Sequence, residues 1–333
     1  MSEFNSDVLL DVKGLKTYFK TERGLLPAVD DASFHVNRGE TLGIVGESGC
    51  GKSISCMSIT RLVESPPGTY EGGEITFDGR TLLRINDDEK YMISDKEMRD
   101  IRGNEISYIF QEPMTSLNPV FRIGRQISEP MMVHQGMSKR ESLEECIRML
   151  ELVRIPNAER VANEYPFSLS GGMRQRAMIA MALVCQPKLL IADEPTTALD
   201  VTIQAQVLDL INDLKSQTNA SIIFITHDLS VISEMSDRVV VMYAGKVAET
   251  APVDQLFIDP KHPYTQGLIA SRPDSGTSGD RLKVIPGNVP DMTERPEGCP
   301  FHPRCEKAMD ICKKEYPPLH EFSDDHSVSC WLY

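Results

Sequence analysis

The sequence has no long hydrophobic run. Its longest uninterrupted apolar stretch is nine residues, 177–185, whereas a helix that crosses a bilayer needs about 20. The N-terminal stretch MSEFNSDVLLDVKG lacks the basic start and apolar core of a secretory signal. These two absences argue against a membrane-spanning or secreted chain, and we expect the protein to stay in the cytosol.

Positive charge is also scarce. The chain carries 35 Lys and Arg residues against 49 Asp and Glu residues, which gives a net charge of −14. Proteins that bind nucleic acid usually present clustered Lys and Arg and a high isoelectric point. The balance therefore argues against a nucleic-acid partner, although a local basic groove stays open. In the simplest interpretation the acidity serves solubility.

Strand and helix patterns alternate along most of the 333 residues. The first part predicts short strands with Gly and Asp turns, at residues 8–12, 32–36 and 74–77. After residue 170, predicted helices alternate with apolar strands, which favours a mostly parallel sheet. Between these parts, residues 112–168 look helical, and Ser138 with Glu141 forms a capping-box pattern. The sequence therefore predicts an α/β fold with an inserted helical subdomain.

A glycine loop follows an apolar strand that we expect at residues 41–45. Its sequence GESGCGKS, at 46–53, fits GxxxxGK[ST], and a helix is expected from Lys52 to about Val63. Glycines let backbone N–H groups wrap phosphates, and the helix presents its positive end to them. Lys52 would supply charge to the β- and γ-phosphates, and Ser53 a hydroxyl ligand for Mg²⁺. The predicted nucleotide contacts are Gly46, Glu47, Ser48, Gly49, Cys50, Gly51, Lys52, Ser53 and Ile54.

Two carboxylates end another apolar strand. The stretch LLIADEP, at 189–195, places Asp193 and Glu194 where that strand stops. Ligands bind at the carboxyl edge of parallel sheets, so both acids are candidates for the functional site. The plainer interpretation is a pair of solvated acids at a strand end.

The stretch LSGGMRQ, at 169–175, is the most informative motif. It lies between the glycine loop and LLIADEP, a lone His227 follows, and this order resembles the ATP-binding cassette (ABC) ATPases. The resemblance implies an ABC-type nucleotide-binding domain over residues 1–258. It would combine a parallel-sheet phosphate-loop core, an antiparallel β subdomain and a helical subdomain at about 112–170. Because LSGG closes over a partner's ATP in that family, we expect half of a two-ATPase motor.

Residue roles follow from the same resemblance, with ATP and Mg²⁺ as ligands. Asp193 would hold Mg²⁺ through water, and Glu194 would polarise the attacking water. Gln111, after a strand expected at 105–110, matches the glutamine that contacts Mg²⁺ and that water. His227 matches the histidine on the γ-phosphate. The expected catalytic residues are Glu194, His227, Lys52 and Gln111, and the expected Mg²⁺ ligands are Ser53, Gln111 and Asp193.

Other positions would face a second cassette. By the resemblance, Ser170, Gly171 and Gly172 contact the opposite γ-phosphate, and Asp200 lies in the segment that touches the opposite subunit. The family's commoner motif is LSGGQ. Met173 takes the fifth place here, which puts only fine tuning in doubt.

An aromatic ring near the N-terminus should stack on adenine, as the resemblance implies. Phe19 is the first choice by its spacing from the expected strand, and Tyr18 is the second. The alternative is an ordinary core or edge-strand aromatic.

The eight cysteines are unevenly placed. Four lie within the last 35 residues: Cys299, Cys305, Cys312 and Cys330. A cytosolic chain rarely keeps disulfides, so these residues are free thiols or metal ligands. Their spacing, C-x5-C-x6-C-x17-C, matches neither a zinc finger nor the ferredoxin run. Spacing alone indicates at most a metal site, with zinc preferred.

The sequence motifs around these cysteines are more specific than the cysteine spacing. HPYT at 262–265, IPG at 285–287 and GCPFHPRC at 298–305 resemble the tail of peptide-importer ATPases, the dipeptide, oligopeptide and nickel group. In that group four cysteines can hold a 4Fe–4S cluster. The resemblance therefore favours an iron–sulfur cluster over zinc or free thiols, in an extension over residues 259–333. A segment so poor in core residues needs a cross-link, such as a bound metal site, to fold.

The resemblance also implies partners and a place in the cell. These are a second, related ATPase in a heterodimer, two transmembrane permease subunits and an extracytoplasmic substrate-binding protein, with this chain on the cytoplasmic face of the membrane. Import of di- or oligopeptides is expected, with nickel or another small solute as the alternative. A non-transport ABC ATPase is disfavoured, because such proteins often carry two cassettes or long coiled-coil inserts.

Overall fold

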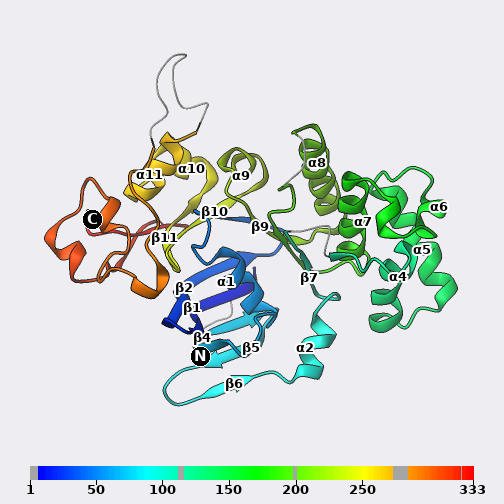
Figure 1. Ribbon diagram of the computed structural model, residues 1–333, viewed down its shortest axis with the longest axis horizontal. Coiled ribbons are helices and arrows are strands. Elements are labelled where there is room, and N and C mark those ends of the chain that lie inside the picture. Colours follow the sequence, from blue (N-terminus) through cyan, green and yellow to red (C-terminus); the bar gives the residue numbers. More distant parts are fainter. Residues whose placement is uncertain (1–6, 112–115, 198–200, 273–283, 324) are drawn as a thin grey trace. The chain divides into compact units, whose positions relative to one another are not determined.

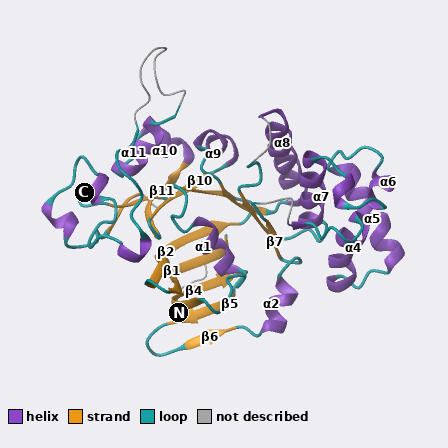
Figure 2. Ribbon diagram, viewed as in Figure 1, coloured by secondary structure: helices purple, strands orange, loops and turns teal. Residues whose placement is uncertain are grey.

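The computed structural model describes residues 7–111, 116–197, 201–272, 284–323 and 325–333. The chain divides into two compact units, one from residues 1–93 and 226–333 and one from residues 94–225. Each unit combines strands with helices (Figure 1, Figure 2). The expected α/β character is therefore present in both.

The first unit contains an antiparallel sheet with the strand order β2-β1-β4-β5-β6. Its strands are β1 (Val8–Thr21), β2 (Gly24–Asn37), β4 (Gly68–Phe77), β5 (Arg80–Ile85) and β6 (Lys90–Met92). Strand β1 runs well beyond the predicted stretch 8–12. Its register with β2 shifts between Val12 and Leu15, and Gly14 takes a φ of 56° there. A bulge thus carries the strand past a glycine that looks like a turn.

A second sheet of the same unit has the order β12-β13-β11-β10-β3. Its strands are β3 (Thr41–Val45), β10 (Arg238–Tyr243), β11 (Lys246–Pro252), β12 (Leu319–Ser323) and β13 (His326–Ser329). Strands β3 and β10 pair in parallel, and every side chain of both is buried. Strand β13 pairs antiparallel with β11. The C-terminal extension therefore adds two strands to this sheet.

The helices of the first unit are short. They are α1 (Lys52–Ile59), α9 (Leu229–Met235), α10 (Val253–Ile258), α11 (Pro263–Ala270) and the 3-10 turns η3 (Met292–Glu294), η4 (His302–Arg304) and η5 (Asp310–Lys313). Helix α1 ends before the predicted limit at Val63. Arg61 has a φ of 52°, and this left-handed conformation does not continue a helix.

The second unit holds three parallel strands in the order β9-β8-β7. They are β7 (Ile106–Ile109), β8 (Leu189–Asp193) and β9 (Ser221–Ile225), and the same unit contains the helices α2 (Asp95–Ile101), α7 (Gly171–Leu183) and α8 (Val201–Thr218). All side chains of β8 and β9 are buried, which explains their continuous apolar sequences.

A group of helices lies between β7 and α7 in the chain, in green in Figure 1. It consists of α4 (Ile123–His134), α5 (Lys139–Leu152), α6 (Ala158–Ala162) and the turn η1 (Pro166–Ser168). The predicted capping box is confirmed at the start of α5, where Ser138 Oγ accepts from Glu141 N at 3.3 Å and Glu141 accepts from Ser138 N at 2.9 Å. Helices α4 and α5 pack together, and Ser128 Oγ donates to the carbonyl of Ser142 at 3.0 Å.

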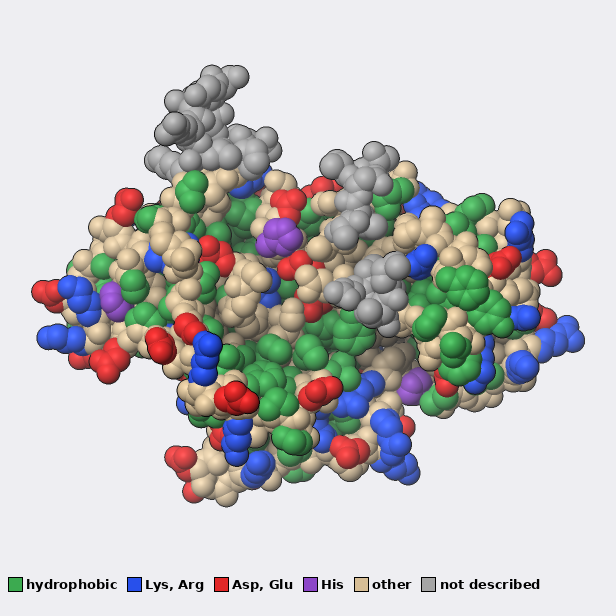
Figure 3. Space-filling view, in the orientation of Figure 1, with side chains coloured by type: hydrophobic (Ala, Val, Ile, Leu, Met, Phe, Trp, Pro, Cys, Tyr) green, Lys and Arg blue, Asp and Glu red, His purple; other side chains and the backbone are tan. Residues whose placement is uncertain are grey.

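None of the helices within the described ranges is both long and apolar enough to cross a bilayer. On the face drawn in Figure 3, Lys and Arg side chains are interspersed with Asp and Glu side chains.

Candidate functional site

The loop between β3 and α1 is built around glycines. Gly46 and Gly51 have φ values of 155° and 99°, which side-chain-bearing residues rarely adopt. A Cβ atom on Gly46 would lie 2.2 Å from the carbonyl oxygen of Met242, and one on Gly51 would lie 2.3 Å from that of Ala28. The N-cap residue of α1 is Gly51, which has no side chain to cap the helix start, as suits a helix start that binds phosphate. The predicted strand, loop and helix are therefore all present.

Lys52 lies folded across this loop. Its side chain is buried, and its Nζ donates to the carbonyls of Gly46 at 2.7 Å and Glu47 at 3.2 Å. Ser53 and Ile54 are half-buried on the first turn of α1, while Ser48 and Gly49 are exposed at the loop tip. The ammonium group thus lies within the ring of backbone that would wrap a phosphate.

His227 also belongs to the first unit. The preceding residue, Thr226, donates its N–H to the carbonyl of Ile44 in β3 at 3.3 Å. The following residue, Asp228, caps α9 by accepting from Ser230 N at 2.8 Å. His227 is exposed between these two anchors, at the end of β3 from which the phosphate loop starts.

The two aromatic side chains that could stack on adenine, Tyr18 and Phe19, have different contacts. Tyr18 donates its hydroxyl to Asp30 at 2.7 Å. Phe19 is half-buried with no polar group to satisfy. It shares a strand face with Thr17, whose hydroxyl lies 2.9 Å from that of Ser58 in α1. This arrangement favours Phe19, and its stacking on adenine stays a prediction.

Asp30 lies at the centre of a charged cluster. Besides the Tyr18 hydroxyl, it accepts from Arg295 at 2.5 Å, and Lys246 Nζ lies 3.1 Å from its carboxylate. Burial by itself would raise the pKa of Asp30, but hydrogen bonds from Arg295 and Tyr18 and the charge of Lys246 outweigh it and lower the pKa to about 2. The cluster therefore holds an ionised carboxylate between β2 and the C-terminal extension.

The second unit brings Asp193, Glu194 and Gln111 together at the ends of its strands. Asp193 is the last residue of β8 and is buried, and it accepts a hydrogen bond from Tyr108 Oη at 2.7 Å. Gln111 follows β7, and its Nε2 donates to Glu194 Oε2 at 3.1 Å. The predicted group of side chains is therefore assembled within this unit.

Glu194 is held in an unusual backbone conformation. Its φ is 47°, and its N–H donates to the carbonyl of Ile225 at 2.9 Å. Thr197 Oγ1 also donates to Glu194 Oε2, at 2.9 Å. Strained backbone of this kind clusters at functional sites. Sequence reasoning missed the partners Tyr108 and Thr197, although Thr197 lies only three residues after Glu194.

The LSGG stretch forms the start of α7. Ser170 is the N-cap residue, and its Oγ accepts from Met173 N at 3.3 Å. Ser170 and Gly171 are exposed, and a Cβ on Gly171 would meet nothing within 4 Å. The buried Gln175 donates to the carbonyl of Pro195 at 2.5 Å, which ties α7 to the end of β8. Asp200 lies outside the described residues.

The predicted residues thus fall into two groups. The phosphate loop, Phe19 and His227 belong to the first unit, whereas Gln111, the two strand-end acids and the LSGG helix belong to the second. Each group is assembled within its own unit.

The four C-terminal cysteines line one small cavity, of about 20 Å³. Burial, together with the neighbouring charges of the other three thiols, raises the pKa of Cys299 to about 12. All four are free of disulfides. Within the described parts of the chain, no three His, Cys, Asp or Glu side chains are arranged to hold a metal ion. The cysteines share a cavity, as expected of a common site, without converging on one point.

The chain is similar to known families and proteins. The family described as ABC transporter matches residues 29–197, and the C-terminal region of oligopeptide/dipeptide transporters matches residues 248–312. The oligopeptide transport ATP-binding protein OppD of Bacillus subtilis is 50% identical over 325 residues, covering 97% of this chain and 88% of OppD. OppD of Escherichia coli is 47% identical over 331 residues, covering 99% of this chain and 95% of that protein.

A solved structure shares the fold. The dimeric ATP-binding cassette MJ0796, in a post-hydrolysis state bound to ADP and Pi, superposes with a TM-score of 0.63 at 26% identity. The superposition covers 74% of this chain and 99% of the cassette.

The phosphate loop, the strand-end acids and these matches define the class: the chain belongs to the ABC transporter family and is an ATPase coupled to transport. Within that family it is an ATP-binding subunit of the oligopeptide type, with that type's C-terminal extension. The resemblance predicted from LSGG and the tail is confirmed, as is the α/β nucleotide-binding fold.

Proposed function

We propose that this subunit drives the import of di- or oligopeptides by binding and hydrolysing ATP at the cytoplasmic face of the membrane. The observation that supports it best is the glycine loop crossed by Lys52, at the uncapped start of α1. The family match over residues 248–312 supports peptides as the substrate class. Nickel or another small solute is the alternative, because the ATPase does not itself hold the transported molecule.

Magnesium fits the side chains at the strand ends. Asp193 is buried and oriented by the Tyr108 hydroxyl, and carboxylate, hydroxyl and amide oxygens are the ligands that Mg²⁺ prefers. We expect Ser53, Gln111 and Asp193 to hold the ion directly or through water. When bound, it neutralises charge on the β- and γ-phosphates.

Glu194 is the proposed general base. Its Oε2 receives hydrogen bonds from Gln111 and Thr197, so its carboxylate has a fixed direction. In hydrolysis it would take a proton from the water that attacks the γ-phosphate. Lys52 would carry charge to the β- and γ-phosphates, and the exposed His227 would contact the γ-phosphate.

The LSGG helix is proposed to serve a second cassette. Ser170 and Gly171 are exposed, and Gly172 is half-buried, at the start of α7. A helix start that presents N–H groups and a hydroxyl suits a phosphate from another molecule. The similar cassette of known structure is described as dimeric, which supports such pairing. The partner in our proposal is a related but different ATPase.

A groove on the helical subdomain is the proposed contact with the permease. It has a volume of about 520 Å³, and its walls are formed by residues of α4, α5 and the segments beside them: Val120, Phe121, Arg122, Gly124, Arg125, Ser128, Met132, Lys139, Leu143, Asn163 and Tyr165. Val120 is 70% exposed. Arg125 lies 3.8 Å from the centre of the Phe121 ring. A groove lined by both apolar and basic side chains suits a short cytoplasmic loop of a membrane subunit.

For the four-cysteine cavity we propose the iron–sulfur cluster that the resemblance favours over zinc, because all four cysteines line this one cavity. A four-iron cluster takes one thiolate at each of four corners. A bound cluster would tie Cys299, Cys305, Cys312 and Cys330 together and hold a core-poor extension. Iron and sulfide analysis after anaerobic purification tests this, and zinc in place of iron would contradict it.

The transport proposal is tested by affinity purification of the tagged chain from detergent-solubilised membranes, under anaerobic conditions. We expect two polytopic membrane subunits and a second ATPase to be recovered with it. The recovered complex, placed in vesicles with its binding protein, should then accumulate labelled peptides only with ATP. Recovery of ribosomal or nucleic-acid partners instead would reject the transporter, and uptake of Ni²⁺ without peptides would select the alternative substrate.

A further inference from the structure

The C-terminal extension contacts the phosphate loop directly. Arg304 Nη1 lies 2.6 Å from Glu47 Oε2, and its Nη2 lies 3.0 Å from Glu47 Oε1. Both residues belong to the first unit. The Arg304 side chain is only 5% exposed, against 29% for that of Glu47. Two parallel hydrogen bonds between a guanidinium and a carboxylate form the most directional kind of ion pair.

The same loop residue is also held through its backbone. Glu47 N donates to the hydroxyl of Tyr264 at 2.9 Å. Tyr264 is fully buried, and its ring lies 4.7 Å from that of Tyr243 and 5.3 Å from that of Phe301. The extension therefore fixes both the main chain and the side chain of one residue in the loop.

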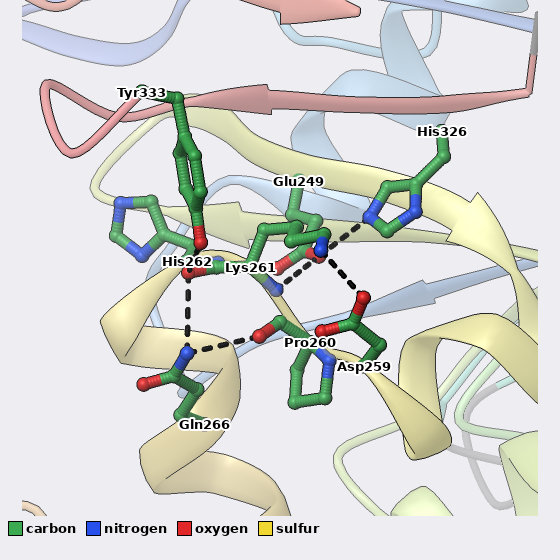
Figure 4. Close-up of polar contacts among 8 residues, drawn as sticks. All are labelled: Glu249, Asp259, Pro260, Lys261, His262, Gln266, His326 and Tyr333. Atoms are coloured by element: carbon green, nitrogen blue, oxygen red, sulfur yellow. Dashed lines mark hydrogen bonds and ion pairs between the residues drawn. The ribbon is translucent and has the colours of Figure 1, made fainter. Parts of the chain in front are cut away.

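Helix α11, which carries Tyr264, is itself anchored to the sheet (Figure 4). The buried carboxylate of Glu249 in β11 accepts from Lys261 N at 2.7 Å and from His262 N at 2.8 Å. His326 Nε2 of β13 lies 3.0 Å from the same carboxylate. The start of α11 is thus tied to β11 and to the end of the chain, so the Tyr264 hydroxyl has little freedom to move.

Arg304 is equally constrained. Its Nε donates to the carbonyl of Pro286 at 2.9 Å, and its Nη1 lies 3.3 Å from the Tyr243 hydroxyl. The guanidinium carbon lies 6.0 Å from the centre of the Phe301 ring. Arg304 directly precedes Cys305, so the segment between the first two cavity cysteines also carries the guanidinium that contacts the loop.

A carboxylate in a phosphate-binding loop needs such a partner. Without a counter-charge, Glu47 would repel a triphosphate bound by the same loop. The paired guanidinium cancels that charge, and because it is always protonated it does so at any physiological pH. A buried pair of this kind is costly to break from one side only, since the other charge is left uncompensated.

We propose that Arg304 is a positioning residue for the nucleotide site, through which the C-terminal extension sets the affinity of the phosphate loop for ATP. Arg304 orients Glu47 and neutralises its charge, and Tyr264 holds the backbone at the same residue. A change at the cysteine cavity that moves residue 304 then alters ATP binding. The inference rests on the proposed nucleotide site.

The test is a double-mutant cycle on the full chain, read out as the Kd for MgATP. Arg304→Ala in the otherwise unchanged chain should raise Kd by about tenfold or more, because it leaves the Glu47 charge unbalanced. The same change made in a Glu47→Gln chain should raise Kd by no more than about threefold. Equal losses in both backgrounds would overturn the proposal, because they would mean that Arg304 supports only the fold.

The assembled transporter supplies a second readout. Arg304→Ala should raise KM for ATP and leave kcat within about twofold, because the lost interaction acts on binding. A fall in kcat with unchanged KM would contradict the assignment. Arg304→Lys keeps the positive charge but cannot form the two parallel hydrogen bonds of a guanidinium. Its KM for ATP should lie between those of the wild type and Arg304→Ala. If Arg304→Ala does not fold, Arg304→Lys in the two Glu47 backgrounds decides the same question.

Two further variants distinguish a failure of the proposed nucleotide site from a failure of the inference about Arg304. Lys313→Ala removes an exposed basic residue of the same extension. Among the described residues the ion pair of Lys313 is with Asp310, which also lies in η5. This variant should leave the Kd for MgATP unchanged. Lys52→Ala should abolish MgATP binding if the proposed nucleotide site is right. Intact binding in Lys52→Ala would reject that site, whereas loss in Lys52→Ala with intact binding in Arg304→Ala would reject only the inference.

Discussion

Two helix starts in this chain carry glycines that we propose contact phosphate, and they differ in how far the surrounding protein encloses them. At α1, a Cβ on Gly46 or Gly51 would lie within 2.3 Å of a backbone carbonyl, and Lys52 is buried across the loop. At α7, Ser170 and Gly171 are exposed, and a Cβ on Gly171 would meet nothing within 4 Å. The first helix start is enclosed by other parts of its own unit, whereas the second lies on the surface, as we expect of a site that serves another molecule.

The comparison implies that one chain can bind ATP but needs a partner to hydrolyse it efficiently. The largest expected effect is that of Glu194→Gln in the assembled pair. Removal of a general base typically slows a reaction about 10²–10⁴-fold, and ATP binding by the phosphate loop should persist. Steady-state hydrolysis and equilibrium binding of MgATP measure the two parts. Unchanged hydrolysis would contradict the role of Glu194, and full hydrolysis by the single chain would break the comparison itself.

The next effect contrasts the glycines of the two helix starts. Gly46→Ala places a Cβ 2.2 Å from the Met242 carbonyl oxygen, so the loop must distort, and we expect a loss of about 3 kcal/mol or more in the free energy of unfolding. Gly171→Ala has open space and should change that free energy by less than about 0.5 kcal/mol. Urea unfolding of both variants checks the difference. Similar losses would mean that the second start is enclosed after all.

An intermediate effect concerns the charged cluster around Asp30 and its contribution to the free energy of unfolding. The pKa of Asp30 is lowered to about 2, against about 3.9 in an unfolded chain. Its contribution is therefore fully present above pH 4 and is lost as the pH falls from about 4 to about 2. We expect about 1–2 kcal/mol of stability to disappear over that range.

Urea unfolding at pH 5 and pH 2.5 measures the loss, and Asp30→Asn should make the pH dependence shallower. Asp310→Asn is the matched control, because the Asp310 side chain is 94% exposed and its ion pair among the described residues is with the exposed Lys313 of η5. An identical pH dependence in the wild type and Asp30→Asn would show that Asp30 is not the group responsible.

The smallest effect uses two serine N-caps of the same chemistry. Ser170 caps α7 and Ser138 caps α5, each accepting from a backbone N–H at 3.3 Å. Changing either serine to alanine should cost about 1 kcal/mol of stability. Only Ser170→Ala should also lower the ATPase rate of the assembled pair, because only that hydroxyl is proposed to meet a partner's phosphate. Equal rates in the two variants would remove this role from Ser170.

Local sequence signals predicted much of the site. The phosphate loop, the strand-end acids and the capping box of α5 each depend on residues a few positions apart, so their patterns are visible in the sequence. Strand β1 was predicted too short, because Gly14 looks like a turn and the bulge that continues the strand depends on pairing with β2. The boundary expected between residues 258 and 259 stays a prediction.

Contacts between distant parts of the chain could not be predicted in the same way. Glu47 and Arg304 are 257 positions apart, and no periodicity or spacing connects them. The motif GCPFHPRC contains Arg304, but nothing in that motif indicates that this arginine contacts the phosphate loop. Its role becomes visible only when folding brings the extension beside the phosphate loop and buries the guanidinium against Tyr243 and Phe301.

The pairing of β13 with β11 has a further consequence, for the behaviour of shortened chains. A strand at the border of a sheet exposes unpaired backbone groups that can recruit strands from other molecules. Here β13 covers β11, and the border passes to β12, a strand of five residues with mostly exposed side chains. A chain cut near residue 258 would leave β11 as an open edge. We therefore expect the extension also to reduce self-association, so that its removal should be visible first as aggregation.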